Sequence, residues 1–241
     1  MKSIDELVST GKKYKDAVVH QQFESKKNTV AYVTMKNKPR VLKWFVPGFR
    51  RQMEVEHSVL KEGSSELNIP HLYDMDDKNN VLVTSYIIGE NLCDVVNDEK
   101  TSVDEKKRLM VLLAEWYARF HSFFKTKEGF RIRGDSILRN FVLSDKIWGV
   151  DFEESRMGKP VEDIAGMCSS ILSTDPMFTK EKFKLCMVFI DSYKKSVDWS
   201  LGNVSDEISY ALLEKIQWRP DDEEQLRKYS RLIKERGMIG F

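Results

Sequence analysis

Residues 133–155 read RGDSILRNFVLSDKIWGVDFEES, and three oxygen-bearing side chains recur along this stretch. Asp135 is followed by Asn140 five residues later and by Asp151 eleven residues after that. Between Asn140 and Asp151, the apolar runs FVLS and IWGV are separated only by an Asp-Lys pair, which is typical of a short β-hairpin. The spacing therefore predicts that the three side chains converge at one end of a small sheet.

The composition is that of an ordinary globular protein. Apolar residues fill 41% of the 241 positions and include 13 Phe and 5 Trp, enough for a buried core in one domain or two small ones. The 39 basic and 38 acidic residues give a net charge of +1, so the composition favours neither nucleic acid nor an anionic membrane as a bulk partner. The longest apolar run, LCMVFI, is too short to span a bilayer. We therefore expect a cytoplasmic protein that does not enter a membrane.

The first third of the chain has the alternating apolar pattern of β-strands. Three such segments are joined by polar turns and occupy residues 16–24, 28–36 and 39–45. Residues 49–63 then place Met53, Glu56 and Val59 on one face of a predicted helix. Residues 68–92 read as two further strands around the turn DDKNN. This part of the chain is expected to form an antiparallel sheet with one helix.

The pattern becomes helical near Val103. Residues 103–124 carry a broad apolar stripe, which predicts a long, half-buried helix. Three more helices are predicted at residues 162–173, 179–197 and 205–218, the last with Ser205 or Asp206 as its cap. The order of elements predicts an α+β protein of two lobes. Residues 1–88 form the small lobe with the sheet, and residues 89–241 form a mostly helical lobe.

The opening stretch contains the groups that phosphoryl transfer requires. This reaction needs Mg²⁺ held by hard oxygen ligands, a cation on the phosphates and an acceptor for the hydroxyl proton. Asp135 is the candidate acceptor of that proton, and Asn140 and Asp151 are the candidate metal ligands. The sequence Asp-x4-Asn followed by Asp is short, however, so its weight depends on the motifs that accompany it.

The accompanying motifs resemble those of the protein-kinase-like superfamily. RGDSILRN is similar to its catalytic loop, and DFE is similar to its metal-binding Asp-Phe-Gly. Lys43 in RVLKWF matches the strand lysine that contacts the nucleotide phosphates. Glu56 on the following helix matches the glutamate that pairs with this lysine, with Glu54 as the competing choice. The resemblance implies a two-lobed kinase fold that binds ATP and Mg²⁺.

The resemblance extends to the hinge and to the second lobe. Ser85, Tyr86 and Ile87 stand where backbone groups of the hinge would contact adenine. KPVEDIAG resembles the P-x-x-D-[IL]-A segment of atypical kinases, in which the residue matching Asp163 braces the catalytic loop. Asp163 is also a candidate N-cap for the helix that follows it.

Several positions depart from the family pattern. The loop FESKKNT lacks the glycines that cover the phosphates in typical protein kinases, and Lys26 or Lys27 is a candidate replacement. Arg133 stands where His is expected, and Glu153 replaces the glycine of Asp-Phe-Gly. Asp163 follows the metal-binding Asp by only twelve residues, which leaves no room for an activation segment. A typical regulated protein kinase is therefore not expected.

Within the superfamily, the sequence resembles the atypical branch. This branch includes the RIO kinases, the small kinase of the KEOPS tRNA-modification complex and the aminoglycoside phosphotransferases. The ARFHS turn is similar to the Leu-His that ends the same helix in that branch, and EDIAGMCSSILSTDP and ERGMIGF resemble the KEOPS kinase. An Asp-Phe-Glu variant also occurs among aminoglycoside- and choline-kinase-like enzymes. The resemblance covers roughly residues 30–195.

The resemblance implies an ATP- and Mg²⁺-dependent phosphotransferase that acts on an alcohol group. The leading interpretation is an atypical Ser/Thr protein kinase, with its own chain or water as further acceptors. One alternative is a small-molecule hydroxyl kinase of the aminoglycoside or choline kinase type. Another is a nucleotide-binding regulatory pseudokinase subunit. The basic tail LRKYSRLIKER reads as a solvated helix face or as a contact to a partner protein or tRNA-modification assembly.

Overall fold

The computed structural model describes residue 8, residues 13–23, residue 25 and residues 27–241. The chain divides into two compact units. The first extends to Ile88 and also includes Trp148–Glu154, and the second comprises Gly89–Ile147 and Ser155–Phe241. A short segment that is distant in sequence is thus part of the first unit. The division of labour between an ATP-binding part, 1–88, and a catalytic part, 89–241, stays a prediction.

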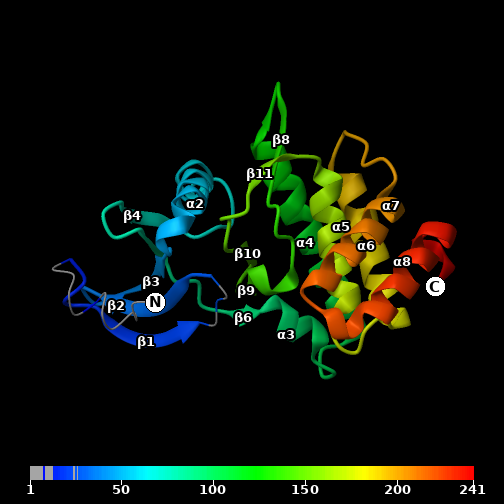
Figure 1. Cartoon of the computed structure of the whole chain (residues 1–241), viewed down its shortest axis with the longest axis horizontal. Coiled ribbons are helices and arrows are strands. Elements are labelled where there is room, and N and C mark those ends of the chain that lie inside the picture. Colours follow the sequence, from blue (N-terminus) through cyan, green and yellow to red (C-terminus); the bar gives the residue numbers. More distant parts are fainter. Residues whose placement is uncertain (1–7, 9–12, 24, 26) are drawn as a thin grey trace. The chain divides into compact units, whose positions relative to one another are not determined.

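A five-stranded antiparallel sheet forms the centre of the first unit (Figure 1). Its strand order is β1-β2-β3-β5-β4. The strands are β1 (Val18–Phe23), β2 (Thr29–Met35), β3 (Lys38–Trp44), β4 (Leu72–Asp76) and β5 (Val81–Ser85). Each of the five overlaps a segment predicted as a strand, and in β2 the buried residues Thr29, Ala31 and Val33 alternate with less buried ones. With the helical second unit, this sheet confirms the predicted α+β class.

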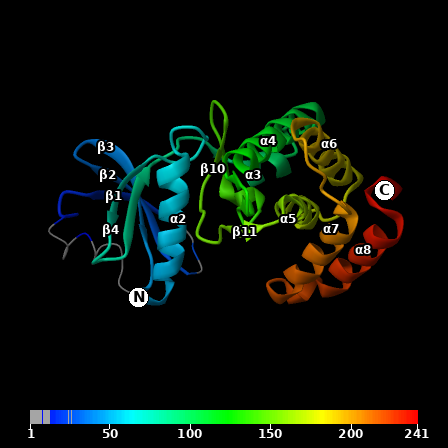
Figure 2. The same cartoon turned by 90° about the horizontal axis from the view of Figure 1, so that it is seen from above.

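The two faces of the sheet bury different clusters. One face carries a core that includes Ala31, Leu42 and Val83. The other face is covered by α2 (Arg50–Gly63), which lies along the sheet in Figure 2 and packs Met53 against Phe45 and Leu82. Because successive side chains of a strand point to opposite faces, the residue after Leu42 points toward α2. That residue is Lys43.

The helix α2 turns one glutamate inward. Its buried residues include Met53, Glu56, Val59 and Leu60, which follow one another at helical spacing. The single turn η1 (Pro47–Phe49) precedes the helix, and proline suits such a start because its missing N–H would have no partner there. Glu56 is therefore held among apolar neighbours on the face that meets the sheet.

Two small sheets belong to the segments around the sequence motif. One has the order β10-β9-β6, and the other has the order β11-β8-β7. Their strands are β6 (Glu90–Asn91), β7 (Lys125–Thr126), β8 (Gly129–Ile132), β9 (Phe141–Leu143), β10 (Ile147–Gly149) and β11 (Arg156–Gly158). The predicted hairpin is present as β9 and β10, and its turn is closed by the N–H of Ser144, which donates to the carbonyl of Lys146 at 2.9 Å.

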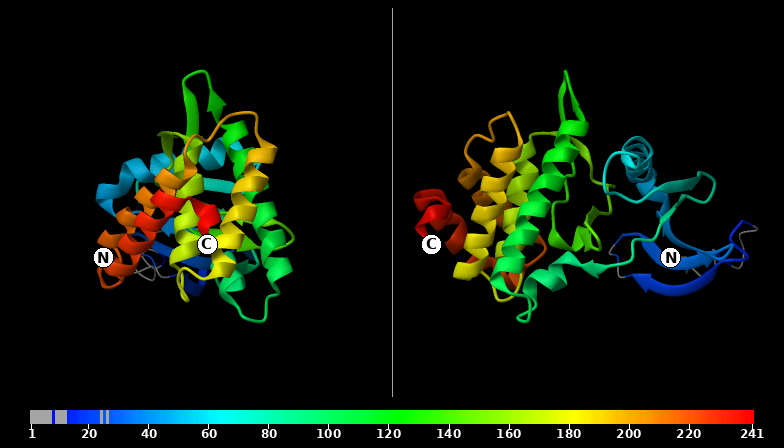
Figure 3. Two further views of the ribbon diagram at one scale, coloured as in Figure 1. Left: turned by 90° about the vertical axis from the view of Figure 1, so that its right-hand side faces the viewer. Right: turned by 180° about the vertical axis from the view of Figure 1, so that it is seen from behind.

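Helices build the rest of the second unit, coloured green to red in Figure 3. They are α3 (Leu92–Asn97), α4 (Val103–Phe123), α5 (Pro160–Ser173), α6 (Lys180–Ser196), α7 (Val204–Glu214) and α8 (Glu223–Arg236), with short turns η2 (Leu138–Asn140), η3 (Lys215–Gln217), η4 (Pro220–Asp222) and η5 (Met238–Gly240). The longest helix, α4, packs along α6, and α5 packs against α6 and α7. Buried aromatic residues such as Tyr117 and Phe189, whose rings meet edge to face at 5.8 Å, fill the space between them.

The last predicted helix differs from the expectation at both ends. Its N-cap is Asn203, whose side chain accepts a hydrogen bond from the N–H of Asp206, so neither Ser205 nor Asp206 caps it. The regular helix ends at Glu214 and continues as the tighter turn η3. Asparagine caps as well as serine or aspartate, so a run of such residues leaves the starting position open.

No helix among the described residues combines the length and the apolar character needed to cross a membrane.

Candidate active site

The side chain of Lys43 lies among three carboxylates of the first unit. Its Nζ is 2.7 Å from Oε2 of Glu56, 2.6 Å from Oδ1 of Asp151 and 2.8 Å from Oε2 of Glu153. The side chains of Lys43, Glu56 and Glu153 are at most 10% exposed, whereas that of Asp151 is 42% exposed. The competing candidate, Glu54, instead pairs with Arg50 at the surface. The structure thus brings Lys43, Glu56 and Asp151 together and leaves Glu54 outside.

Burial and charge act against each other in this cluster. Burial disfavours the ammonium of Lys43, but Asp151, Glu56 and Glu153 outweigh it and raise the pKa of Lys43. Burial also raises the pKa of Glu56 and of Glu153, and Lys43 opposes both shifts. The cluster holds three carboxylates against one ammonium. An additional cation would therefore be favoured close to these oxygens.

The acidic segment that follows β10 is shaped by its backbone. Asp151 has a φ of 64°, in the left-handed region that aspartate tolerates better than most residues. The N–H of Gly149, just before it, donates to the carbonyl of Asn68 at 3.0 Å and ties the segment to the first unit. This backbone turn lets Asp151 and Glu153 both reach Lys43.

The loop before β2 contacts the same segment. Nδ2 of Asn28 donates to Oε2 of Glu153 at 2.5 Å, and Nζ of Lys27 donates to Oε1 of Glu154 at 2.8 Å. Lys27 is one of the two lysines expected to replace the missing glycines, and the other, Lys26, lies outside the described residues. Asn28 is not among the site residues predicted from the sequence. An asparagine beside a strand usually marks a turn, so no pattern distinguished it.

The predicted hinge residues follow β5 directly. The N–H of Ser85 donates to the carbonyl of His71, so this backbone donor is already used within the sheet. Ile87 lies two residues further on, in irregular structure. The ring of Tyr86 stacks on that of Tyr32 with 4.1 Å between centroids. Tyr32 pairs with Val41 across β2 and β3, which places it on the same face as Lys43.

Asp135 and Asn140 are joined within the second unit. Nδ2 of Asn140 donates to both the carbonyl oxygen and Oδ2 of Asp135, each at 3.1 Å. Asn140 is buried at the end of η2, whereas the carboxylate of Asp135 is partly exposed. Gly134 before it has a φ of 82°, a conformation that glycine adopts without strain. The structure therefore presents Asp135 on a constrained loop.

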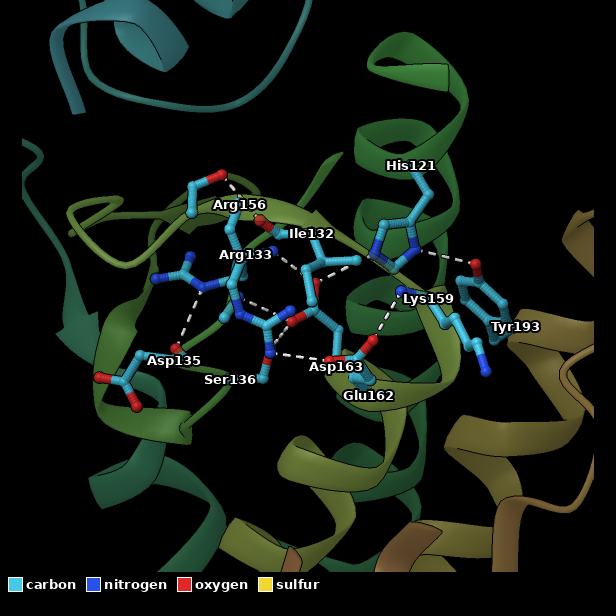
Figure 4. Close-up of polar contacts among 12 residues, drawn as sticks. His121, Ile132, Arg133, Asp135, Ser136, Arg156, Lys159, Glu162, Asp163 and Tyr193 are labelled. Atoms are coloured by element: carbon cyan, nitrogen blue, oxygen red, sulfur yellow. Dashed lines mark hydrogen bonds and ion pairs between the residues drawn. The ribbon is translucent and has the colours of Figure 1, made fainter. Parts of the chain in front are cut away.

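Asp163 braces this loop from α5, as Figure 4 shows. It accepts hydrogen bonds from the N–H of Arg133 at 2.6 Å, the N–H of Gly134 at 3.0 Å and Oγ of Ser136 at 2.7 Å. Its side chain lies within the first turn of α5, so the predicted bracing contact is present and Asp163 is not the N-cap. Burial raises the pKa of Asp163, but the hydrogen bonds, that with His121 first, outweigh it and lower the pKa.

A second row of buried groups supports the brace. Nε2 of His121 lies 3.0 Å from Oδ2 of Asp163, and its Nδ1 lies 2.8 Å from the hydroxyl of Tyr193 (Figure 4). That hydroxyl also accepts a hydrogen bond from the indole N–H of Trp199 at 3.2 Å. The histidine of the ARFHS motif thus connects α4, α5 and α6. Trp199 carries no sequence signal that would have linked it to the motif.

Arg133 stands where the family pattern has histidine, and its side chain is buried beside the loop that carries Asp135. It is 1% exposed, and its guanidinium lies 4.8 Å from the ring centroid of Phe141. Its Nε donates to the carbonyl of Asp135 at 3.3 Å. A planar, permanently charged group suits this place, because it can stack on an aromatic ring and still donate. The substitution therefore keeps a hydrogen-bond donor beside the loop.

Lys215 is a further basic group near Asp135. Burial lowers the pKa of Lys215, and the negative charge of Asp135 opposes this shift. Lys215 opens the turn η3 after α7, eighty residues beyond Asp135. No local pattern connects the two, because the helical spacing of residues 205–218 predicts a regular helix through this position.

Oxygen atoms in each unit suit Mg²⁺. One carboxylate oxygen from each of Glu56, Asp151 and Glu153 lies within 4.8 Å of the others. In the second unit, Asn140 uses its amide nitrogen on Asp135, which leaves its Oδ1 as a candidate ligand. Carboxylate and amide oxygens are the donors that Mg²⁺ prefers. The residues present therefore fit the metal that the motif implies.

A comparison with protein-family models and with curated proteins finds no match. Solved structures do resemble the chain. The kinase of Cydia pomonella granulovirus matches with 16% identity and a TM-score of 0.50, over 65% of this chain and 61% of that one.

Two further neighbours match over most of their length. A choline/ethanolamine kinase family protein from Mesorhizobium loti has 13% identity and a TM-score of 0.62, over 96% of this chain and 93% of that one. An aminoglycoside-3′-phosphotransferase of type VIII has 12% identity and a TM-score of 0.64, over 86% of this chain and 96% of that one. The sheet with α2, the braced loop and these neighbours lead to one conclusion: the chain has the protein-kinase-like fold.

Proposed function

We propose that the chain is an ATP- and Mg²⁺-dependent phosphotransferase that transfers the γ-phosphoryl group of ATP to an alcohol. The observation that carries this proposal is the contact of Lys43 with both Glu56 and Asp151. A lysine held extended by a buried glutamate, beside a candidate metal ligand, is the arrangement that phosphoryl transfer uses. The fold, shared with enzymes of this chemistry, supports it.

Each site residue has a defined task in this reaction. Lys43 binds the α- and β-phosphates, and Glu56 keeps its ammonium extended. Asn140 and Asp151 would hold Mg²⁺, which neutralises charge that develops on the phosphates. Asp135 accepts or orients the proton of the acceptor hydroxyl. Asp163 and Arg133 position the loop that carries Asp135, through the hydrogen bonds described above.

The backbone after β5 would contact the adenine base. Ser85, Tyr86 and Ile87 are the residues proposed for this contact. The stacked pair of Tyr86 and Tyr32 supports the assignment, because it places an aromatic surface on the face of the sheet that carries Lys43. Aromatic faces bind flat bases by stacking.

The proposed acceptor is a Ser or Thr residue of a protein, in keeping with the atypical Ser/Thr kinases that the motifs resemble. A small-molecule hydroxyl is the second candidate. It is favoured by the neighbours, since the choline/ethanolamine kinase family protein and the aminoglycoside phosphotransferase each match more of this chain than the granulovirus kinase does. A cytoplasmic location, and a contact of α8 with a partner protein or tRNA-modification assembly, stay predictions from the sequence.

The fate of γ-labelled ATP tests the proposed function. Purified protein is incubated with Mg²⁺ and labelled ATP, alone and with a Ser/Thr protein substrate, choline or an aminoglycoside. Label is expected on its own chain, on one acceptor or in free phosphate. Asp135→Asn is expected to lower kcat by at least about 100-fold, as for loss of a general base, and Asp151→Asn is expected to abolish turnover by removing a metal ligand.

Asp198→Asn is the matched control, because its side chain is 85% exposed and lies in neither cluster. It should retain full activity. If ATP binds but its γ-phosphate reaches neither an acceptor nor water, the chain is a nucleotide-binding regulatory subunit. Transfer that survives both Asp135→Asn and Asp151→Asn would show that the site has been assigned to the wrong residues.

A further inference from the structure

Three hydrogen-bond donors of the first unit converge on one short acidic segment, Asp151–Glu154. Lys43 contacts Asp151 and Glu153, Asn28 contacts Glu153, and Lys27 contacts Glu154. The donors come from two places in the sequence, the loop before β2 and the strand β3. Each carboxylate of the segment is matched by an ammonium or amide donor.

Asn28 is the most constrained of these donors. It is 4% exposed, and its backbone N–H donates to Oγ of Ser25. Among the described residues, its Oδ1 accepts no hydrogen bond although it is buried. Val30, two residues later, pairs with Lys43 across β2 and β3. Asn28 itself lies in the bend just before β2, and its Nδ2 and Nζ of Lys43 contact the same oxygen, Oε2 of Glu153.

Lys27, in contrast to Asn28, has an exposed side chain. Its side chain is 41% exposed, and its Nζ lies 5.6 Å from the ring centroid of Phe49 as well as 2.8 Å from Glu154. Its partner Glu154 is 42% exposed. A pair of this kind is weakly held, because water competes for both charges. The ammonium of Lys27 can therefore exchange Glu154 for an anion that binds it more strongly.

The loop itself contains no glycine, which limits how it can bind phosphate. Glycine loops let phosphate oxygens approach backbone N–H groups, because no Cβ stands in the way. In the sequence FESKKNT every residue carries a side chain. Side-chain donors can take the place of such N–H groups, and Lys27 and Asn28 are described members of the loop that already bind anionic oxygens.

We propose that Lys27 and Asn28, together with Lys43, bind the polyphosphate of the nucleotide, and that Glu153 and Glu154 occupy these donors until the nucleotide displaces them. The inference rests on the proposed function, because it names the residues that hold its ATP. Carboxylates and phosphates offer the same donors the same kind of anionic oxygen. The acidic segment is thus a competitor for the phosphate site.

Because the donors and the carboxylates compete, variants on the two sides of the contact should change nucleotide affinity in opposite directions. Removing a donor weakens nucleotide binding, whereas removing the competing carboxylate strengthens it. Lys27→Met is expected to weaken Mg·ATP binding about tenfold, as for loss of a hydrogen bond to a charged group. Glu154→Gln is expected to tighten it about threefold, the effect of freeing one exposed ion pair. Asn28→Leu is expected to weaken binding as well.

The dissociation constants are measured by isothermal titration calorimetry with Mg·ATP and, separately, with adenosine. Lys78→Met is the matched control, because Lys78 is an exposed lysine of the same unit, on the turn between β4 and β5. It should bind like the wild type. Adenosine lacks phosphate, so its binding should not change in any variant. In the double variant Lys27→Met/Glu154→Gln, the gain from Glu154→Gln should disappear, since the two residues act through one contact.

The inference is overturned if Lys27→Met binds Mg·ATP like Lys78→Met, or if Glu154→Gln weakens binding. Either result, with a wild type that binds and turns over ATP, leaves the proposed function standing and removes only the roles of Lys27 and Glu154. A wild type that binds no Mg·ATP overturns the proposed function itself. The exposed positions of Lys27 and Glu154 make both variants suitable for a folded comparison.

Discussion

Asp163 joins α5 to the loop that carries Asp135. Four donors meet its carboxylate, which is 1% exposed. Its pKa is lowered, so the folded state binds the proton less readily than the unfolded chain does. The stability that this carboxylate contributes is therefore complete above the unfolded pKa of about 4 and is lost as the pH falls through the folded value.

Asp163→Asn tests this account at the scale of one residue. The variant should lose about 3–5 kcal/mol of unfolding free energy at pH 7, as for breaking a buried charged network. Its stability should also depend less on pH between roughly pH 5 and 3, because the titrating group is gone. Urea unfolding across this range measures both effects. Asp198→Asn is the control, and an equally steep acid loss in Asp163→Asn would mean that other carboxylates cause it.

At the scale of the element, the longest helix depends on its first turn. Oγ of Ser102 accepts a hydrogen bond from the N–H of Glu105 at 3.2 Å, and Asp104 and Glu105 add negative charge at the same end of α4. Ser102→Ala should cost about 1 kcal/mol of unfolding free energy, because one N–H loses its partner. Ser102→Asp should restore it, since aspartate caps equally well.

Urea unfolding at pH 7 compares the three proteins. Ser102 is exposed, so changes in packing do not complicate the comparison. If Ser102→Asp is as unstable as Ser102→Ala, the loss does not come from the missing cap. If Ser102→Ala has full stability, packing of α4 along α6 fixes the helix start without help from the cap.

The elements were predicted where one local rule decides them. The alternation in β2 follows from burial on one side of the strand, whereas in β3 the adjacent residues Leu42 and Lys43 are both buried. The start of α7 could not be predicted, because Asn203, Ser205 and Asp206 are all good caps and only one position meets the free N–H. The helix pattern likewise did not show where α7 tightens into η3.

The candidate site shows the same division between local and long-range effects. The spacing of Asp135 and Asn140 within one loop was enough to expect them near each other, and the structure joins them by a hydrogen bond. The contact between Asn28 and Glu153 spans 125 positions of sequence, and the one between His121 and Tyr193 spans 72. Such contacts depend on tertiary packing, which no local pattern of one sequence encodes.

At the scale of the whole molecule, the division into two units bears on whether the chain unfolds in one cooperative step. Each unit has its own buried core, with Leu42 in the first and Leu113 in the second, both fully buried. The segment Trp148–Glu154 belongs to the first unit although its neighbours in sequence belong to the second. Units with separate cores can open separately, as cooperative blocks of hydrogen exchange.

Hydrogen exchange on two core variants measures that independence. Leu42→Ala should cost about 2–5 kcal/mol, as a cavity in a buried cluster. It should speed exchange in β2, β3 and β5, and also in residues 148–154, because the N–H of Gly149 is held by Asn68 of the same unit. Protection in α4 and α6 should stay near the wild-type level. Leu113→Ala should show the reverse pattern. Equal acceleration in both units by either variant would mean that the chain unfolds as one cooperative block.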